Sequence, residues 1–170
     1  MNAIFLDFDG VLNDKDYFYR SEEKIEKFKR DTNFEEKWYD DFELCADKLM
    51  LHFDPSKLEL LQEIVDETDS KIVIISSWRE MIEYPFVEKR LKDYGLPIMG
   101  RIVDHNKDRG KGIRNYLKIH KEIDNYIILD DETKEYTESE LSHLVKTDFF
   151  KSGLNEEHKD ETIKRLRKKI

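Results

Sequence analysis

Apolar residues form three short runs along the chain, and each run ends abruptly in polar residues. The runs cover residues 3–6, 71–76 and 126–130, and they end at Asp7-Phe8-Asp9-Gly10, Ser76-Ser77 and Asp130-Asp131. Short apolar runs of this kind are typical of central strands in a parallel sheet, which are buried on both faces. The pattern therefore predicts three such strands.

Helical patterns lie between these runs. Asp54 followed by Pro55 predicts a helix start, since aspartate caps helices and proline suits their first turn. Apolar residues at 58, 61 and 65 then follow helical spacing, and a second stripe at 87, 91 and 94 stops at Gly95. A third pattern starts near Lys111, and Asn155 predicts the cap of a last helix.

Strands that alternate with helices predict an α/β fold with a Rossmann-like, three-layer parallel sheet. In open sheets of this kind, ligands bind beyond the carboxyl ends of the strands. The polar residues that end the three runs are therefore expected to converge on one site.

Residues 14–52 do not follow this alternation. The segment is charged, yet it holds eight of the chain's twenty aromatic residues, which argues against a disordered linker. We interpret 1–170 as one domain, and 14–52 as a small, mostly helical cap insertion packed over the site.

Composition narrows the possible partners and location. The net charge of −9 argues against an extended nucleic-acid-binding surface, because such surfaces are basic. The single cysteine, Cys45, allows no internal disulfide. The first apolar run is cut by Asp7 after four residues, so we expect no signal peptide or membrane anchor and a cytoplasmic protein.

The carboxylates that end the first and third runs predict a metal-dependent reaction. Asp7 and Asp9, separated by one residue, can hold Mg²⁺ while one of them attacks phosphorus, and Asp131 can complete the oxygen shell. A phosphate bound there needs donors, which Ser76 or Ser77 and Arg109 or Lys111 can supply. Together these groups meet the needs of phosphoryl transfer through an aspartyl-phosphate.

These residues carry a resemblance to a known family. The stretch Asp7-Phe8-Asp9-Gly10-Val11-Leu12 resembles the first motif of the haloacid dehalogenase (HAD) superfamily, and the remaining motifs follow in the family's order. The stretches at 75–79, 128–131 and 153–154 are more specifically similar to the small HAD domains associated with RNA-repair proteins. The resemblance covers roughly the whole chain outside the insertion.

The resemblance implies a role for each residue. Asp7 would be the nucleophile, and Asp9 would protonate the leaving oxygen and later activate water. Asp131 would be the side-chain metal ligand, joined by the Asp9 backbone carbonyl, with Asp130 acting nearby or in a second layer. Ser76 would bind the phosphoryl oxygens.

Two of these assignments have rivals. Ser77 competes with Ser76, because a shift of one residue decides between them. Arg109 precedes Gly110 and has apolar residues four and eight positions later, as the family spacing requires, whereas Lys111 precedes Gly112 but leaves Arg114 and Asn115 where apolar residues are expected. We favour Arg109, although lysine is the commoner family choice.

The sequence thus predicts a Mg²⁺-dependent phosphomonoester hydrolase acting on a small phosphorylated metabolite, a nucleotide or a nucleic-acid end. A phosphotransferase or phosphomutase would use the same intermediate, and a non-catalytic phosphate-binding module remains a further alternative. A signalling receiver domain ranks lower, since receivers place their acidic pair on the first strand and here it comes last.

Overall fold

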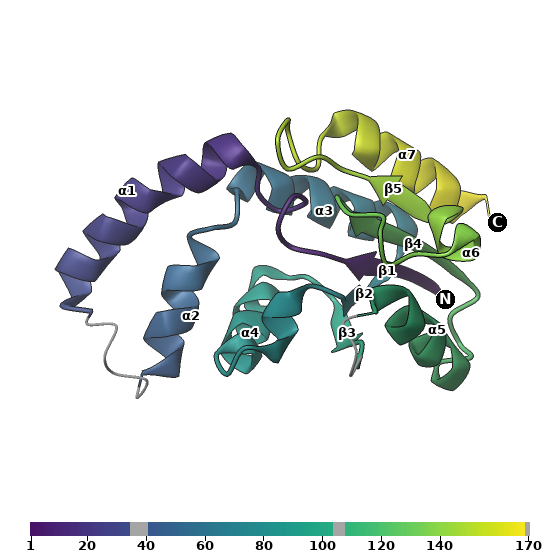
Figure 1. Ribbon diagram of the computed structural model, residues 1–170, viewed down its shortest axis with the longest axis horizontal. Coiled ribbons are helices and arrows are strands. Elements are labelled where there is room, and N and C mark those ends of the chain that lie inside the picture. The colour runs from purple at the N-terminus through teal and green to yellow at the C-terminus, as the bar shows by residue number, and fades with distance from the viewer. Residues whose placement is uncertain (35–40, 104–107, 169–170) are drawn as a thin grey trace.

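A five-stranded, all-parallel sheet forms the centre of the protein (Figure 1). The computed structural model describes residues 1–34, 41–103 and 108–168. The strand order is β3-β2-β1-β4-β5, so the first strand lies in the middle. The strands are β1 (Asn2–Leu6), β2 (Lys71–Ile74), β3 (Ile98–Arg101), β4 (Asn125–Asp130) and β5 (Leu144–Lys146).

Helices cover both faces of this sheet. The described part of the chain forms α1 (Lys15–Thr32), α2 (Phe42–Met50), α3 (Pro55–Thr68), α4 (Tyr84–Tyr94), α5 (Arg109–Ile119), α6 (Glu138–Leu141) and α7 (Glu156–Arg167), with a short 3-10 helix, η1 (Ser77–Glu80). The three-layer α/β architecture predicted from the alternation of strands and helices is confirmed.

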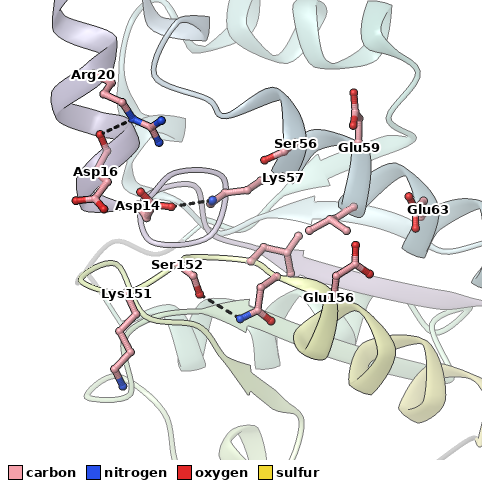
Figure 2. Close-up of a pocket in the computed structure, with 13 residues that line it drawn as sticks. Asp14, Asp16, Arg20, Ser56, Lys57, Glu59, Glu63, Lys151, Ser152 and Glu156 are labelled. Atoms are coloured by element: carbon pink, nitrogen blue, oxygen red, sulfur yellow. Dashed lines mark hydrogen bonds and ion pairs between the residues drawn. The ribbon is translucent and has the colours of Figure 1, made fainter.

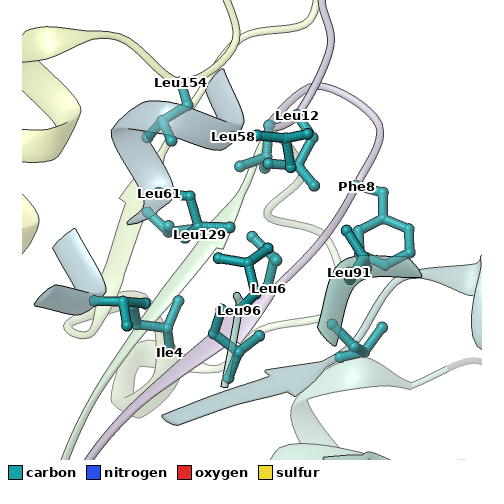
Figure 3. Packing of buried hydrophobic residues seen from close by; sticks show 14 of the residues in the cluster. Ile4, Leu6, Phe8, Leu12, Leu58, Leu61, Leu91, Leu96, Leu129 and Leu154 are labelled. Atoms are coloured by element: carbon teal, nitrogen blue, oxygen red, sulfur yellow. The ribbon is translucent and has the colours of Figure 1, made fainter. Parts of the chain in front are cut away.

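Alternation along β1 divides the core into two halves. Ile4 and Leu6 face a large cluster built with α3, α4 and α7, part of which Figure 3 shows. Phe5 faces a smaller cluster on the other side, where Ile113 of α5 packs. Because neighbouring side chains of a strand point to opposite faces, the all-apolar run requires burial on both sides. The site at the end of β1 therefore stands on a rigid, fully covered strand.

The expected helix ends are also found. The Asp54 side chain accepts a hydrogen bond from the Ser56 amide and Pro55 opens α3, while Gly95 ends α4 with a φ of 111°. The Asn155 side chain caps α7 by accepting from the His158 amide at 3.0 Å. The edge strands β3 and β5 were not predicted, because neither holds an unbroken apolar run: β3 ends in Gly100 and Arg101, and β5 has three residues that end in Lys146.

The segment 14–52 is mostly helical where it is described, as predicted. It forms α1 and α2, whereas residues 35–40, including Trp38 and Tyr39, lie outside the described residues. α2 is fastened to α4, since Arg90 pairs with Asp47 at 2.6 Å and the Phe42 and Phe86 rings stack at 5.7 Å. A role of this segment as a cap over the site stays a prediction.

None of the helices in the described part of the chain has the length and apolar character needed to cross a membrane.

The packing of α3 on the sheet yields a stability prediction. Leu61 is fully buried in the larger cluster, so Leu61→Ala removes buried surface and leaves a cavity. We expect the free energy of unfolding to fall by about 2–5 kcal/mol in urea denaturation. Leu141→Ala, at an exposed position on α6, is the matched control and should change it by less than about 0.5 kcal/mol. Equal effects of the two substitutions would contradict the assigned core.

Candidate active site

The predicted acidic residues meet where β1 and β4 end. The two strands are hydrogen-bonded neighbours, with Leu6 opposite Leu129, and the Asp7 amide extends the pairing by donating to the Leu129 carbonyl at 3.0 Å. Asp7 therefore lies beside Asp130. Since the chain leaves β1 towards β2 on one side while β4 lies on the other, this is the kind of sheet position at which α/β proteins bind ligands.

Three carboxylates at this point form a group suited to a cation. Asp7, Asp130 and Asp131 each offer an oxygen, and these oxygens lie within 4.8 Å of one another. Burial and the Asp130 charge raise the pKa of Asp7 to about 7, and the same two causes raise the pKa of Asp131 to about 6. A divalent cation would relieve this repulsion, and Mg²⁺ prefers such oxygen ligands. The donor set thus fits the metal that the sequence predicts.

The Arg109 guanidinium bridges two of these carboxylates. Its Nη1 donates to Asp7 Oδ2 at 2.7 Å and to Asp130 Oδ2 at 2.6 Å. These two charges raise the pKa of Arg109 despite its burial. Lys111, the rival, is exposed, and its backbone amide donates to the side chain of Asp108, which caps α5. Of the two, the structure brings Arg109 to the carboxylates.

Ser76 and Ser77 occupy different environments at the end of β2. Ser76 is fully buried, and its hydroxyl lowers the pKa of Asp7 by hydrogen bonding to it. It also caps η1 by accepting a long bond from the Trp78 amide. Ser77 is exposed. The structure therefore places Ser76, rather than Ser77, beside the predicted nucleophile.

Asp9 is held by two residues whose part in the site was not predicted. Its Oδ1 accepts from Asn13 Nδ2 at 3.0 Å, and its Oδ2 accepts from Trp78 Nε1 at 2.9 Å. Asp9 is absent from the carboxylate group described above, and a metal contact through its backbone carbonyl stays a prediction. A tryptophan two residues after Ser76 was the one available sequence signal for this contact.

Gly10 allows the loop after Asp9 to approach β4 closely. Its φ is 77°, and a Cβ there would lie 2.4 Å from Asp131 Cγ. Any other residue would strain the backbone and push Asp131 away. The Gly10 amide also donates to Asn13 Oδ1 at 3.0 Å. The glycine thus brings Asp131 next to the Asp9 loop.

Three protein groups donate hydrogen bonds to the Asp130 carboxylate. Besides Arg109, its Oδ2 accepts from the Tyr136 hydroxyl at 2.5 Å, and its Oδ1 accepts from the Glu132 amide at 2.8 Å. Burial and Asp130 raise the pKa of Tyr136, so the hydroxyl remains a donor. Sequence reasoning missed Tyr136, because four residues separate it from the acidic pair. Because both of its oxygens already accept from protein groups, Asp130 is better suited to orienting Arg109 than to binding a metal ion.

A buried ion pair anchors the far end of the Asp9 loop. Lys57 Nζ contacts Asp14 Oδ2 at 2.8 Å and Asp54 Oδ2 at 3.3 Å, which ties the cap of α1 to the cap of α3. Figure 2 shows the Asp14–Lys57 pair in a pocket of about 480 Å³ that also borders the start of α7. The mixed acidic and basic lining includes none of the carboxylates at the strand ends. This pair therefore supports the loop from outside the site.

Comparison with known families agrees with this geometry. A family model described as "HAD domain in Swiss Army Knife RNA repair proteins" matches residues 3–159. Searches of curated proteins and of solved structures gave no match. The matched range contains every residue discussed for the site.

The carboxylate group predicts a stabilising effect of divalent cations. Added Mg²⁺ should raise the melting temperature of chelator-treated protein in a concentration-dependent way, because a cation that binds only the folded state stabilises it. Asp131→Asn should markedly reduce this rise, while Asp160→Asn, an exposed residue of α7, should leave it unchanged. Scanning fluorimetry measures both. An equal rise in the wild type and in Asp131→Asn would rule out this cation site.

Proposed function

The chain belongs to the HAD domains of Swiss Army Knife RNA repair proteins, and from this membership we propose that it is a Mg²⁺-dependent phosphomonoester hydrolase. Membership supports a phosphohydrolase-type activity in general. The observation that carries the finer proposal is the contact of Arg109 with both Asp7 and Asp130 beside Asp131. The proposed nucleophile Asp7, the metal site and the phosphate-binding Arg109 therefore lie next to one another.

In the proposed reaction, Asp7 is the nucleophile. An Asp7 carboxylate oxygen attacks phosphorus, the ester bond to the leaving oxygen breaks, and Asp9 gives that oxygen a proton. Asp9 then takes a proton from water, whose oxygen attacks phosphorus and releases inorganic phosphate and free Asp7. Asp131, Asp7 and the Asp9 carbonyl would hold Mg²⁺, which neutralises charge on the phosphoryl oxygens when it is bound.

Arg109 and Ser76 serve the phosphoryl group. Arg109 lies 2.7 Å from Asp7, so it can bind a phosphoryl oxygen next to the attacking carboxylate. The buried Ser76 hydroxyl can donate to a second oxygen. Donors held in place before the reaction stabilise developing charge without reorganisation.

The substrate proposed is a small phosphorylated metabolite, a nucleotide or a nucleic-acid end. The family description refers to RNA repair proteins, which favours the last two. The net charge of −9 favours a short substrate over a long strand. A transferase would form the same aspartyl-phosphate and pass phosphate to an alcohol, so release of inorganic phosphate distinguishes the two activities.

The catalytic carboxylates are tested by phosphate release. Wild-type protein should release phosphate from a panel of nucleotides and phosphate-terminated oligonucleotides only when Mg²⁺ is present. Asp7→Asn should abolish release, and Asp9→Asn should lower kcat by about 10²–10⁴-fold, since it removes the acid and base. Asp160→Asn is the matched control and should keep full activity. Activity that survives in Asp7→Asn would refute the mechanism.

The two pairs of rival residues are separated by matched substitutions. Arg109→Ala should lower kcat/KM by about 10²-fold or more, the scale of losing one electrostatic donor, and Arg109→Lys should restore part of it. Lys111→Ala should remain within about twofold of wild type. Ser76→Ala should likewise exceed Ser77→Ala in effect. A larger loss from Lys111→Ala than from Arg109→Ala would reverse the assignment.

A further inference from the structure

A continuous series of aromatic rings leads away from Asp9 towards solvent. We define the aromatic strip as Trp78, His52, Phe18, Phe149 and Phe150. Trp78 donates to Asp9 Oδ2, and its ring meets His52 edge to face at a centroid distance of 6.1 Å. The remaining contacts are His52 with Phe18 at 5.3 Å, Phe18 with Phe149 at 6.3 Å, and Phe149 with Phe150 at 5.4 Å.

The strip brings together segments that are distant in sequence. Trp78 follows β2, His52 follows α2, Phe18 lies on α1, and the last two rings lie on the loop between β5 and α7. The inner end is fixed, because Trp78 stacks on the buried Phe53 at 5.2 Å. Four separate parts of the fold therefore supply rings to one strip that starts at the proposed acid and base.

The outer end of the strip is held in an exposed position. Phe150 is 77% exposed, although its loop is tied down by several backbone bonds. Its own amide donates to Asp148 Oδ1 at 3.0 Å, and the Phe149 carbonyl accepts from the Lys15 amide at 2.8 Å. Phe150 continues the partly exposed rings of Phe149 and Phe18, and apolar surface that is contiguous rather than scattered indicates a binding role. A ring needed only for the core would be buried.

The chemistry of the strip favours a flat, uncharged ring system as its ligand. Phenylalanine and indole rings offer π-faces rather than charges, and burial lowers the pKa of His52, so its ring is neutral at pH 7. Stacking of a nucleobase on such rings is tolerant of base identity. A sugar without a base would gain little from this surface.

We propose that the aromatic strip is the subsite for the leaving group, and that it binds the nucleobase of a nucleoside phosphate by stacking. The proposal rests on the proposed function for the position of the phosphate. With the phosphoryl group at Asp7 and Arg109, the base of the same nucleotide would lie along Trp78, His52 and Phe18. A second base, where there is one, would reach Phe149 and Phe150.

Equilibrium binding tests the strip separately from turnover. Calorimetry with Asp7→Asn, which should not hydrolyse its ligand, compares adenosine 5′-monophosphate and adenosine 3′-monophosphate with ribose 5-phosphate. We expect at least one adenosine phosphate to bind about tenfold more tightly than ribose 5-phosphate, the scale of one base–aromatic stack. Adding Phe18→Leu should remove most of this preference and leave ribose 5-phosphate binding unchanged.

Phe150 provides a second variant that does not endanger folding, because its ring is exposed. Phe150→Ala should weaken binding of a 5′- or 3′-phosphorylated diadenosine dinucleotide several-fold more than binding of the corresponding mononucleotide. Tyr94→Ala, which removes a partly exposed ring at the end of α4, is the matched control and should change neither. Circular dichroism verifies that each variant is folded.

The possible outcomes are distinct for the two proposals. Equal affinity for adenosine phosphates and ribose 5-phosphate, or a preference that survives both Phe18→Leu and Phe150→Ala, overturns the strip as a base subsite. Neither result bears on the proposal that the protein hydrolyses phosphomonoesters. A clear preference for adenosine phosphates, combined with no phosphate release from wild-type protein, would reject the hydrolase and support the strip.

Discussion

Mutual repulsion between three carboxylates at the ends of two neighbouring strands is the constraint on which the site depends. Asp7 closes the central strand and Asp130 and Asp131 close the next, so the parallel register brings like charges together. Burial adds to the cost, as the raised pKa of Asp7 shows. Arg109 offsets part of it through two short contacts. The negative charge that Arg109 does not offset would be neutralised by a divalent cation and by the surrounding hydrogen-bond donors.

The rest of the fold keeps these groups in place. The central strand is covered on both faces, and the loop that follows it is fixed by the close approach of Gly10 to Asp131 and by the buried Asp14–Lys57 pair. Asp9 is oriented by Asn13 and Trp78. The carboxylates are thus positioned by rigid strands, while the groups that would meet the leaving group come from loops, from η1 and from α1. This division suits a scaffold that keeps one chemistry and varies its substrate.

The central strands and the acidic cluster were predictable because their signals are local. Each of the three central strands holds an unbroken apolar run, and Asp7, Ser76 and the pair Asp130-Asp131 stand at the ends of these runs. The choice of Arg109 followed from the spacing of apolar residues along α5. Trp78, Asn13 and Tyr136 were not predicted as parts of the site, since their contacts depend on how loops fold back on the strand ends. The edge strands were missed because neither holds an unbroken apolar run like those of the central strands.

The aromatic strip shows the same limit more clearly. The abundance of aromatic residues in 14–52 was visible in the sequence, but the meeting of Phe18 with His52, Trp78 and Phe149 was not. Packing of a helix, a turn and a distant loop creates it, and no periodic pattern records such a meeting. The proposed base subsite therefore depends on tertiary contacts rather than on the strand-end motifs.

The central claim is that Asp7 carries the phosphoryl group during the reaction, and chemical trapping tests it most directly. Borohydride reduces an acyl phosphate to an alcohol, so enzyme quenched with borohydride during turnover should contain homoserine at position 7 in peptide mass spectra. The account predicts this change only when both substrate and Mg²⁺ are present. Efficient turnover with an unmodified Asp7, or with the modification at another carboxylate, would contradict it.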